Sequence, residues 1–168
     1  MHIHAYEKLW LALSIVLILA LIGTVTYGAV GPGVAMVADT QPTVDATALD
    51  EDERFSEPRV EQVGEDEYEV YVVARQFGFQ PDPIVVPANS TVTFQVTSAD
   101  VIHGFEVAGT NANAMAVPGE VSEITVETDD PDEYGIVCNE YCGAGHHGME
   151  GKFNVVSQSE FESGGDDE

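Results

Sequence analysis

The sequence predicts a small all-β domain, arranged as a Greek-key sandwich or barrel, with one N-terminal transmembrane helix. Three features of the 168 residues lead to this prediction: an uncharged stretch near the N-terminus, a series of short β-rich runs, and an acidic stretch between them. They divide the chain into five predicted segments. These are an N-terminal end (1–8), an anchor and its exit (9–38), an acidic linker (39–67), the β domain (68–156) and an acidic tail (157–168).

The anchor is predicted from an uncharged stretch that runs from Leu9 to Ala38. A helix needs about 20 apolar residues to cross a bilayer, and the residues from Leu9 to about Val30 supply them before Gly31-Pro32-Gly33 ends the helix. The alternative is a cleaved signal peptide, whose apolar core is about 7–15 residues long behind a basic start. Here the core is longer and only Lys8 precedes it, which favours a retained anchor in the cell membrane. The same lysine places the N-terminus in the cytoplasm and the remaining domain outside.

The segments on either side of the β domain are predicted to have little structure. Residues 39–67 are rich in Pro, Thr and acidic side chains and show little hydrophobic periodicity, which is typical of a solvated tether. Residues 157–168 have the same character and predict a frayed tail.

The β domain is predicted from short runs that are separated by proline-containing turns. Two of the runs, Thr91–Val96 and Ser122–Glu127, alternate apolar and polar residues with the period of a half-buried strand. Seven short strands with turn signals between them indicate a sandwich or a small barrel. The candidate strands are residues 68–74, 84–87, 91–97, 104–107, 121–127, 134–138 and 152–156.

The charge of the chain is extreme, because five Lys or Arg residues face thirty Asp or Glu residues and the net charge is −25. Nucleic acid is excluded as a partner, since phosphate binding needs basic residues. A hydrophobic content of 44% argues against global disorder. A folded surface this acidic predicts a protein that works in concentrated salt, where charges are screened within about 3 Å at 1 M. Ordinary acidity for solubility is the alternative.

A cluster of soft and borderline metal ligands lies in the last third of the chain. Cys138, Cys142, His146 and Met149 fall within twelve residues, and His103 lies upstream in an apolar stretch. This is the set of ligands that copper prefers. Two cysteines are one more than a blue-copper centre uses, so the arrangement predicts two coppers bridged by two thiolates.

Each copper of such a pair needs one imidazole and one weak axial ligand. We expect His103 and Met149 to serve one copper, and His146 with a backbone carbonyl, that of Glu140, to serve the other. The pair would spread one unpaired electron over both metals and change its geometry little between redox states. It therefore suits electron transfer rather than bond-making chemistry, and we expect no catalytic residue on this chain.

The same loop also allows a disulfide, because a Cys-x-x-x-Cys pair outside the cytoplasm is often oxidised. The histidine and the methionine that follow Cys142 favour metal binding instead. Gly143, Gly145 and Gly148 allow the tight backbone turns that would fold the loop around a metal.

The pattern C-x-E-x-C-x-x-x-H-x-x-M, with D-V-x-H upstream, resembles the CuA-binding subunit II of haem-copper cytochrome c oxidases. The resemblance covers the anchor and nearly the whole soluble part. The single hydrophobic segment and the run Val-Ile-His-Gly-Phe look most like the B-branch of these oxidases. Other runs that carry the resemblance are Ala5-Tyr-Glu-Lys-Leu-Trp10, Phe77-Gly-Phe79-Gln-Pro81-Asp-Pro83-Ile and Val117-Pro-Gly-Glu120.

The resemblance implies a cupredoxin-like fold, a dinuclear CuA centre and a function as the electron-accepting subunit of a terminal oxidase. The implied partners are a catalytic subunit I that reduces oxygen, a cytochrome c or blue-copper donor, and the lipid bilayer. In many relatives a glutamate at the position of Glu140 also meets magnesium, whereas B-branch relatives often carry glutamine there, so we assign no magnesium. Phe77 and Phe79 are either core aromatics or part of an apolar patch where a donor docks.

Other functions fit the sequence less well. A copper chaperone can carry Cys-x-x-x-Cys and a histidine, but it would usually have a thioredoxin-like α/β pattern. A free-standing blue-copper carrier would use one cysteine, and a nitrous oxide reductase needs a large additional domain. The CuA subunit of a nitric oxide reductase stays open as an alternative, because the catalytic partner decides the substrate.

Overall fold

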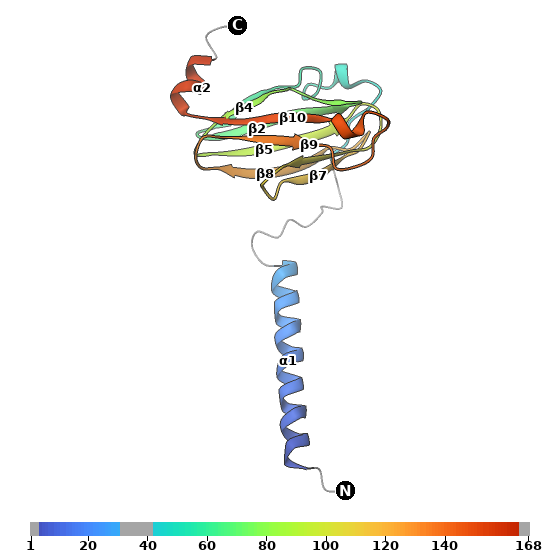
Figure 1. The fold of residues 1–168 in the computed structure, drawn as a ribbon, viewed down its shortest axis with the longest axis vertical. Coiled ribbons are helices and arrows are strands. Elements are labelled where there is room, and N and C mark those ends of the chain that lie inside the picture. Colours follow the sequence, from blue (N-terminus) through green and yellow to red (C-terminus); the bar gives the residue numbers. More distant parts are fainter. Residues whose placement is uncertain (1–3, 31–41, 165–168) are drawn as a thin grey trace. The chain divides into compact units, whose positions relative to one another are not determined.

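The computed structural model describes residues 4–30 and 42–164, which belong to two compact units, residues 1–39 and 40–168. The first unit contains one helix, α1 (Ala5–Val30), and the second contains the β domain (Figure 1). Residues Ala5–Tyr27 are long and apolar enough to cross a membrane, and their large hydrophobic side chains are exposed. Water would penalise such a surface, whereas lipid would not. Positions 31–38 of the predicted anchor lie outside the described residues.

The β domain is a sandwich of two five-stranded sheets. The first sheet has the order β1-β2-β5-β8, with β3 paired to β2, and the second has the order β4-β10-β9-β6-β7. The pairs β2–β5 and β4–β10 are parallel and all other pairs are antiparallel. The strands of the first sheet are β1 (Val60–Gly64), β2 (Glu67–Arg75), β3 (Gly78–Gln80), β5 (Ser90–Ser98) and β8 (Ser122–Thr128). Those of the second are β4 (Ile84–Pro87), β6 (His103–Val107), β7 (Asn113–Ala116), β9 (Asp132–Val137) and β10 (Glu150–Val156).

The core lies between the two sheets and is built from side chains that alternate along the strands. Phe94 of β5 contacts Phe105 of β6 and Phe153 of β10, with ring centroids 5.2 and 5.3 Å apart. All three rings are almost completely buried, and burial of one such side chain contributes about 1.5–3 kcal/mol. The predicted all-β sandwich is therefore confirmed. The apolar side chains that alternate along the strands hold the two sheets together, because those of both sheets pack into one core.

Three strands were not predicted, because each carries a weak strand signal. β1 is mostly exposed and does not alternate apolar and polar residues, β3 has three residues, and β7 (Asn113–Ala116) contains Asn and Ala, which are depleted in strands. Pairing with a neighbour specifies each of them: β1 and β3 with β2, and β7 with β6.

The prediction of a solvated linker over residues 39–67 is wrong for the part that the structure describes. Residues 42–58, here called the strap, cover the outer face of the first sheet, with Leu49 and Phe55 only 4% and 2% exposed. They pack with Tyr71, Val73 and Val121 in a second hydrophobic cluster. The sequence signal for this cover is the continuous apolar run at positions 70–74 of β2, because a strand that is apolar on both faces needs cover on both.

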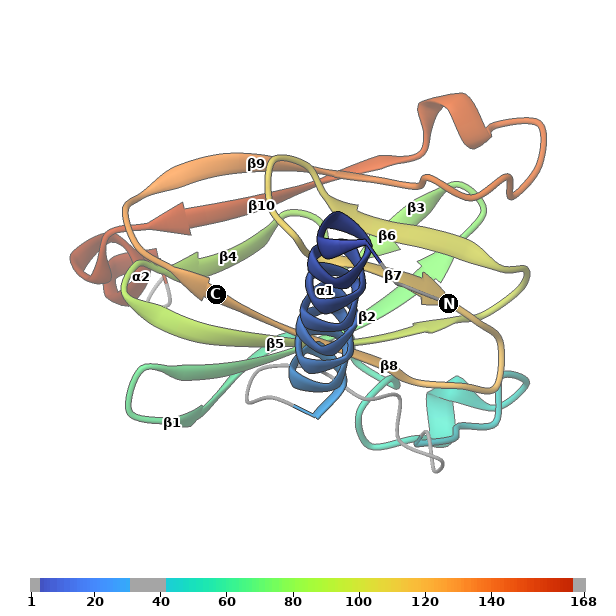
Figure 2. The same ribbon diagram turned by 90° about the horizontal axis from the view of Figure 1, so that it is seen from below.

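The acidic tail also differs from its prediction. Residues Gln158–Gly164 form the helix α2, and the half-buried ring of Phe161 packs edge-on against Tyr68, 5.5 Å between centroids. One aromatic residue in an acidic stretch is enough to dock a short helix. In Figure 2 this helix (red) lies at one end of the sandwich and the loop between β9 and β10 (orange) lies at the other.

Candidate metal centre

The ligand loop, residues 138–149, connects β9 to β10 and carries four of the predicted metal ligands. Cys138 directly follows β9, and its amide donates to the carbonyl of Met149, 3.2 Å away, which closes the loop at its base. A short 3₁₀ turn, His146–Gly148, brings the chain back toward β10. The loop therefore starts and ends on neighbouring antiparallel strands, so its first and last ligands lie side by side.

His103 reaches the same place from a different part of the chain. It is the first residue of β6, which pairs with β9 through Glu106 and Val137. Its side chain is fully buried, and its Nδ1 lies 4.0 Å from the Sγ of Cys138. Strand pairing thus brings together two predicted ligands that are 35 positions apart.

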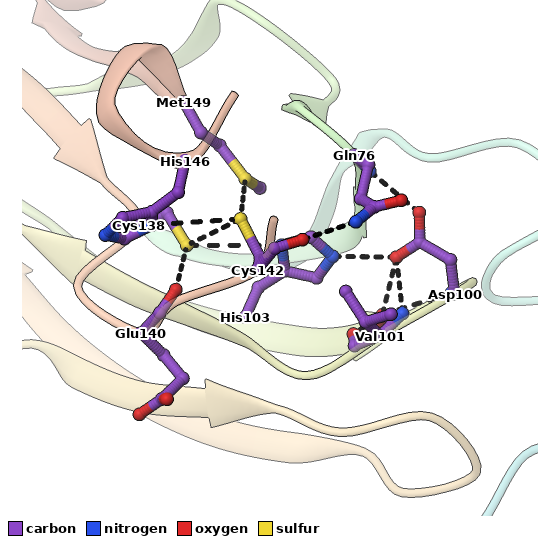
Figure 3. Close-up of polar contacts among 10 residues, drawn as sticks. Gln76, Asp100, Val101, His103, Cys138, Glu140, Cys142, His146 and Met149 are labelled. Atoms are coloured by element: carbon purple, nitrogen blue, oxygen red, sulfur yellow. Dashed lines mark hydrogen bonds and ion pairs between the residues drawn. The ribbon is translucent and has the colours of Figure 1, made fainter. Parts of the chain in front are cut away.

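The predicted donor atoms converge on the two thiols (Figure 3). The Sγ atoms of Cys138 and Cys142 are 3.7 Å apart. The thiol of Cys138 lies 3.1 Å from the carbonyl oxygen of Glu140, and that of Cys142 lies 3.8 Å from His146 Nδ1 and 3.6 Å from Met149 Sδ. The ligand atoms of His103, Cys138 and Cys142 all lie within 4.8 Å of one another.

These distances fit donors around metal ions rather than a disulfide. A disulfide has an S–S distance of about 2.05 Å, and both cysteines here are free. Bonds from zinc, for comparison, are about 2.3 Å to sulfur and about 2.0–2.1 Å to imidazole nitrogen, so donors about 3–4.5 Å apart can share one ion. The donor set itself, two thiols, two imidazoles and one thioether, is the soft set that suits copper.

Some polar groups near the loop do not join the cluster. The carboxylate of Glu140 points away from the sulfur atoms, and only its carbonyl faces Cys138 (Figure 3). His147 is exposed, and so is His4, which belongs to the other unit and directly precedes α1. His2 lies outside the described residues.

Burial makes the thiol of Cys142 reluctant to ionise. It raises the pKa of Cys142 to about 11, and the hydrogen bond with Cys138 adds to the increase. A bound cation would reverse this effect, because coordinating thiols are deprotonated. The site is thus suited to a neutral Cys142 thiol without a metal and to a thiolate when a metal is bound.

Asp100 orients the buried histidine. Its carboxylate accepts hydrogen bonds from His103 Nε2 at 2.7 Å, from the amide of Val101 at 2.6 Å and from the amide of Gln76 at 2.8 Å. Burial opposes ionisation of Asp100, but these hydrogen bonds outweigh it and lower the pKa of the carboxyl. With Nε2 bound to Asp100, Nδ1 is left free to face Cys138, which is how ligating histidines are usually held.

An apolar surface adjoins the cluster. Val101, Ile102, Met115 and Tyr141, here called the apolar window, are 39%, 44%, 40% and 75% exposed and line an open depression that reaches Cys142. Phe79, by contrast, is 3% exposed and packs in the core. Such a group of exposed apolar side chains stands out on a chain with thirty acidic residues.

Sequence comparisons point to one family. The profile of a family described as cytochrome c oxidase subunit II, periplasmic domain, matches residues 69–156. Cytochrome c oxidase subunit 2 of Thermus thermophilus is 42% identical over 154 residues, which cover 90% of this chain and 92% of that protein. Heme-copper oxidase subunit 2 of Aeropyrum pernix is 35% identical over 111 residues, 58% of this chain and 47% of that protein.

Solved structures agree with the sequence comparisons. One similar structure is a chain of a heme-copper terminal oxidase dimer, determined by cryo-EM, with a TM-score of 0.66 and 34% sequence identity. The match covers 90% of this chain and 99% of that chain. The periplasmic domain of subunit II of cytochrome oxidase from Bradyrhizobium japonicum has a TM-score of 0.53 at 26% identity, over 56% of this chain and 88% of that one.

Proposed function

This chain belongs to the cytochrome c oxidase subunit II family, and we propose that its candidate metal centre is a dinuclear copper centre of the CuA type. The chain is an electron-transfer subunit of a haem-copper oxidase, and a catalytic subunit I is its implied partner. Oxygen reduction belongs to that partner. The family also argues against the chaperone and the free-standing blue-copper alternatives.

The observation that carries the copper proposal is the pair of free, buried thiols 3.7 Å apart, each with its own imidazole: His103 Nδ1 lies 4.0 Å from Cys138, and His146 Nδ1 lies 3.8 Å from Cys142. Cys138 and Cys142 would bridge the two metals. His103 and Met149 would complete one coordination sphere, and His146 with the carbonyl of Glu140 would complete the other. When bound, two bridged coppers supply a one-electron carrier.

The protein contributes rigidity and shelter from water to this carrier. His103 is fully buried, and Cys142 and Met149 are 4% and 3% exposed, so the donors have little room to rearrange. His146 is half-buried and its ring lies 5.8 Å from that of the exposed Tyr141. One side of the centre is therefore close to the surface, where an electron can be received.

We infer that a small electron donor, a cytochrome c or a blue-copper protein, docks on the apolar window. The window reaches Cys142, a bridging ligand in this proposal, so a docked donor would lie close to the metals. An apolar contact is also insensitive to screening, whereas charge steering weakens steeply with ionic strength.

The apolar helix followed by a periplasmic-type domain indicates a single-pass membrane protein. We propose that the N-terminus is cytoplasmic and the β domain extracytoplasmic, in line with the positive charge of Lys8 in the first turn of α1. We also propose that the net charge of −25 adapts the domain to concentrated salt, which screens the repulsion among its carboxylates.

The test of the copper centre is the metal content of the full chain, purified in detergent and loaded with copper in concentrated salt, together with its electron paramagnetic resonance spectrum. Two coppers per chain with a seven-line hyperfine pattern are expected, because one unpaired electron would be shared by two nuclei. One copper with a four-line pattern, or no copper, would overturn the proposal.

A further inference from the structure

The turn between β2 and β3 contacts two separate parts of the candidate metal centre. We propose that Gln76 and Phe77, here called the clamp, hold the ligand loop and His103 in a metal-ready arrangement before any metal binds. This inference rests on the proposed copper function, and Gln76 is a positioning residue within it, since it touches no metal ligand atom.

The first contact of the clamp leads to His103. The backbone amide of Gln76 donates to Asp100 Oδ2 at 2.8 Å, and the other carboxylate oxygen, Oδ1, lies 2.7 Å from His103 Nε2. The carboxylate is therefore held from one side by the clamp and holds the imidazole on the other (Figure 3). A shift of the turn would shift the carboxylate, and with it the direction of His103 Nδ1.

The second contact leads to the ligand loop. The side-chain amide of Gln76 donates a hydrogen bond to the carbonyl oxygen of Cys142 (Figure 3). Within the described residues, this is the only hydrogen bond to Cys142 that comes from outside the loop. Because the carbonyl and the thiol of Cys142 branch from the same Cα atom, fixing the first limits where the second can point.

The third contact is steric and explains two glycines of the loop. A Cβ atom at Gly145 would lie 2.5 Å from the ring of Phe77, and one at Gly143 would lie 2.7 Å from Gln76 Nε2. Both are closer than real Cβ contacts, so a side chain at either position would displace part of the clamp: the ring of Phe77 at Gly145, and the flexible end of Gln76 at Gly143. Phe77 is 41% exposed, which means that its ring covers the loop rather than filling the core.

The position of the clamp explains why it matters for a metal. The middle of the loop lies outside the strand ladder, so ladder hydrogen bonds do not hold Cys142 in place. Groups that orient metal ligands from outside the coordination sphere typically change metal affinity or activity 10–100-fold when they are removed. Gln76 has this role for Cys142 directly and for His103 through Asp100.

The experiment compares the wild-type full chain in detergent with Gln76→Met, which keeps the length of the side chain and loses its donor. Gln80→Met is the matched control, because Gln80 is an exposed glutamine of the adjacent strand β3. Two readouts are needed: the rate of copper release to a chelator, and amide hydrogen exchange at residues 142–145 in the metal-free chain.

The clamp predicts that Gln76→Met releases copper about tenfold faster and exchanges faster at residues 142–145, while Gln80→Met matches the wild type. Unchanged release and exchange in Gln76→Met would overturn the clamp, as would faster exchange spread over the whole domain, which would mean a general loss of stability. If the wild type itself fails to bind two coppers, the proposed function falls, and the exchange measurement on the metal-free chain still decides whether the clamp orders the loop.

Discussion

The ligand loop and the strap are the two long irregular segments of the β domain, and they are held in place by different forces. The strap is fixed by two apolar side chains, Leu49 and Phe55, that fill a hydrophobic cluster on the outer face of the first sheet. The ligand loop is fixed by hydrogen bonds at its base and from Gln76, and it buries the thiol of Cys142, whose ionisation burial opposes. The side chains that anchor the strap are apolar, as suits a segment that stabilises the fold. Those that anchor the ligand loop are polar, as suits a segment that binds.

The two segments also differ in what they would lose on substitution. A truncated side chain in the strap leaves a cavity, and the cost appears in the free energy of unfolding. A changed donor in the ligand loop leaves the fold in place and alters the metal centre. The following four predictions test this separation, from the largest expected effect to the smallest.

Cys142→Ser is expected to abolish the dinuclear centre and leave at most one copper in a different environment, because a hydroxyl cannot replace a bridging thiolate. The measurement is copper stoichiometry with the electron paramagnetic resonance spectrum. Tyr141→Phe, at the exposed neighbouring residue, is the control and should keep both coppers. An unchanged spectrum and stoichiometry in Cys142→Ser would defeat the bridging role.

Phe55→Ala is expected to lower the free energy of unfolding by about 3 kcal/mol, since a buried phenylalanine is lost and a cavity remains. Denaturant unfolding of the metal-free chain in concentrated salt measures this change. Phe161→Ala, at the half-buried ring of α2, should cost clearly less. Equal costs for the two variants would show that the strap is no better anchored than α2.

Tyr71, beneath the strap, is expected to make stability fall at high pH. Burial raises its pKa to about 12, and the hydrogen bond that its hydroxyl donates to Glu69 adds to the increase. Above about pH 10 the unfolded chain loses this proton while the folded chain keeps it, so stability declines until about pH 12. The full decline is at most about 3 kcal/mol, because each pKa unit is worth about 1.4 kcal/mol.

The measurement for Tyr71 is the unfolding midpoint as a function of pH, compared between the wild type and Tyr71→Phe. The variant lacks the ionisable hydroxyl and should decline less over this range. Identical pH profiles would mean that Tyr71 ionises as easily in the folded domain as in the unfolded chain.

Met149→Leu is expected to keep both coppers and shift the redox potential, because a weak axial thioether tunes a copper centre more than it holds it. The swap conserves volume, so its cost in stability should stay below about 1.5 kcal/mol. Met115→Leu, in the apolar window, is the control and should leave the potential unchanged. Loss of all copper from Met149→Leu would show that the thioether is an essential ligand.

The sequence by itself determined the fold class and placed four of the five side-chain donors on one loop, whereas His103 reaches them only through strand pairing. The alternation of apolar and polar residues in β5 and β8 predicts a sheet with one buried and one more exposed face. The spacing of the predicted ligands places four donors on one short loop, namely Cys138, Cys142, His146 and Met149. Local patterns of this kind are readable because period and spacing depend on neighbouring residues alone.

Only the tertiary structure showed which residues cover the first sheet and which residues hold the ligand loop in place. Phe55 and Leu49 lie in an acidic stretch with no periodic pattern, and their burial depends on the outer face of β2, which is formed elsewhere in the chain. Gln76 meets Asp100 and Cys142, which lie 24 and 66 positions away, only after the strands have paired. Contacts between residues far apart in sequence leave no periodic signal, so the strap and the clamp became visible only in the folded domain.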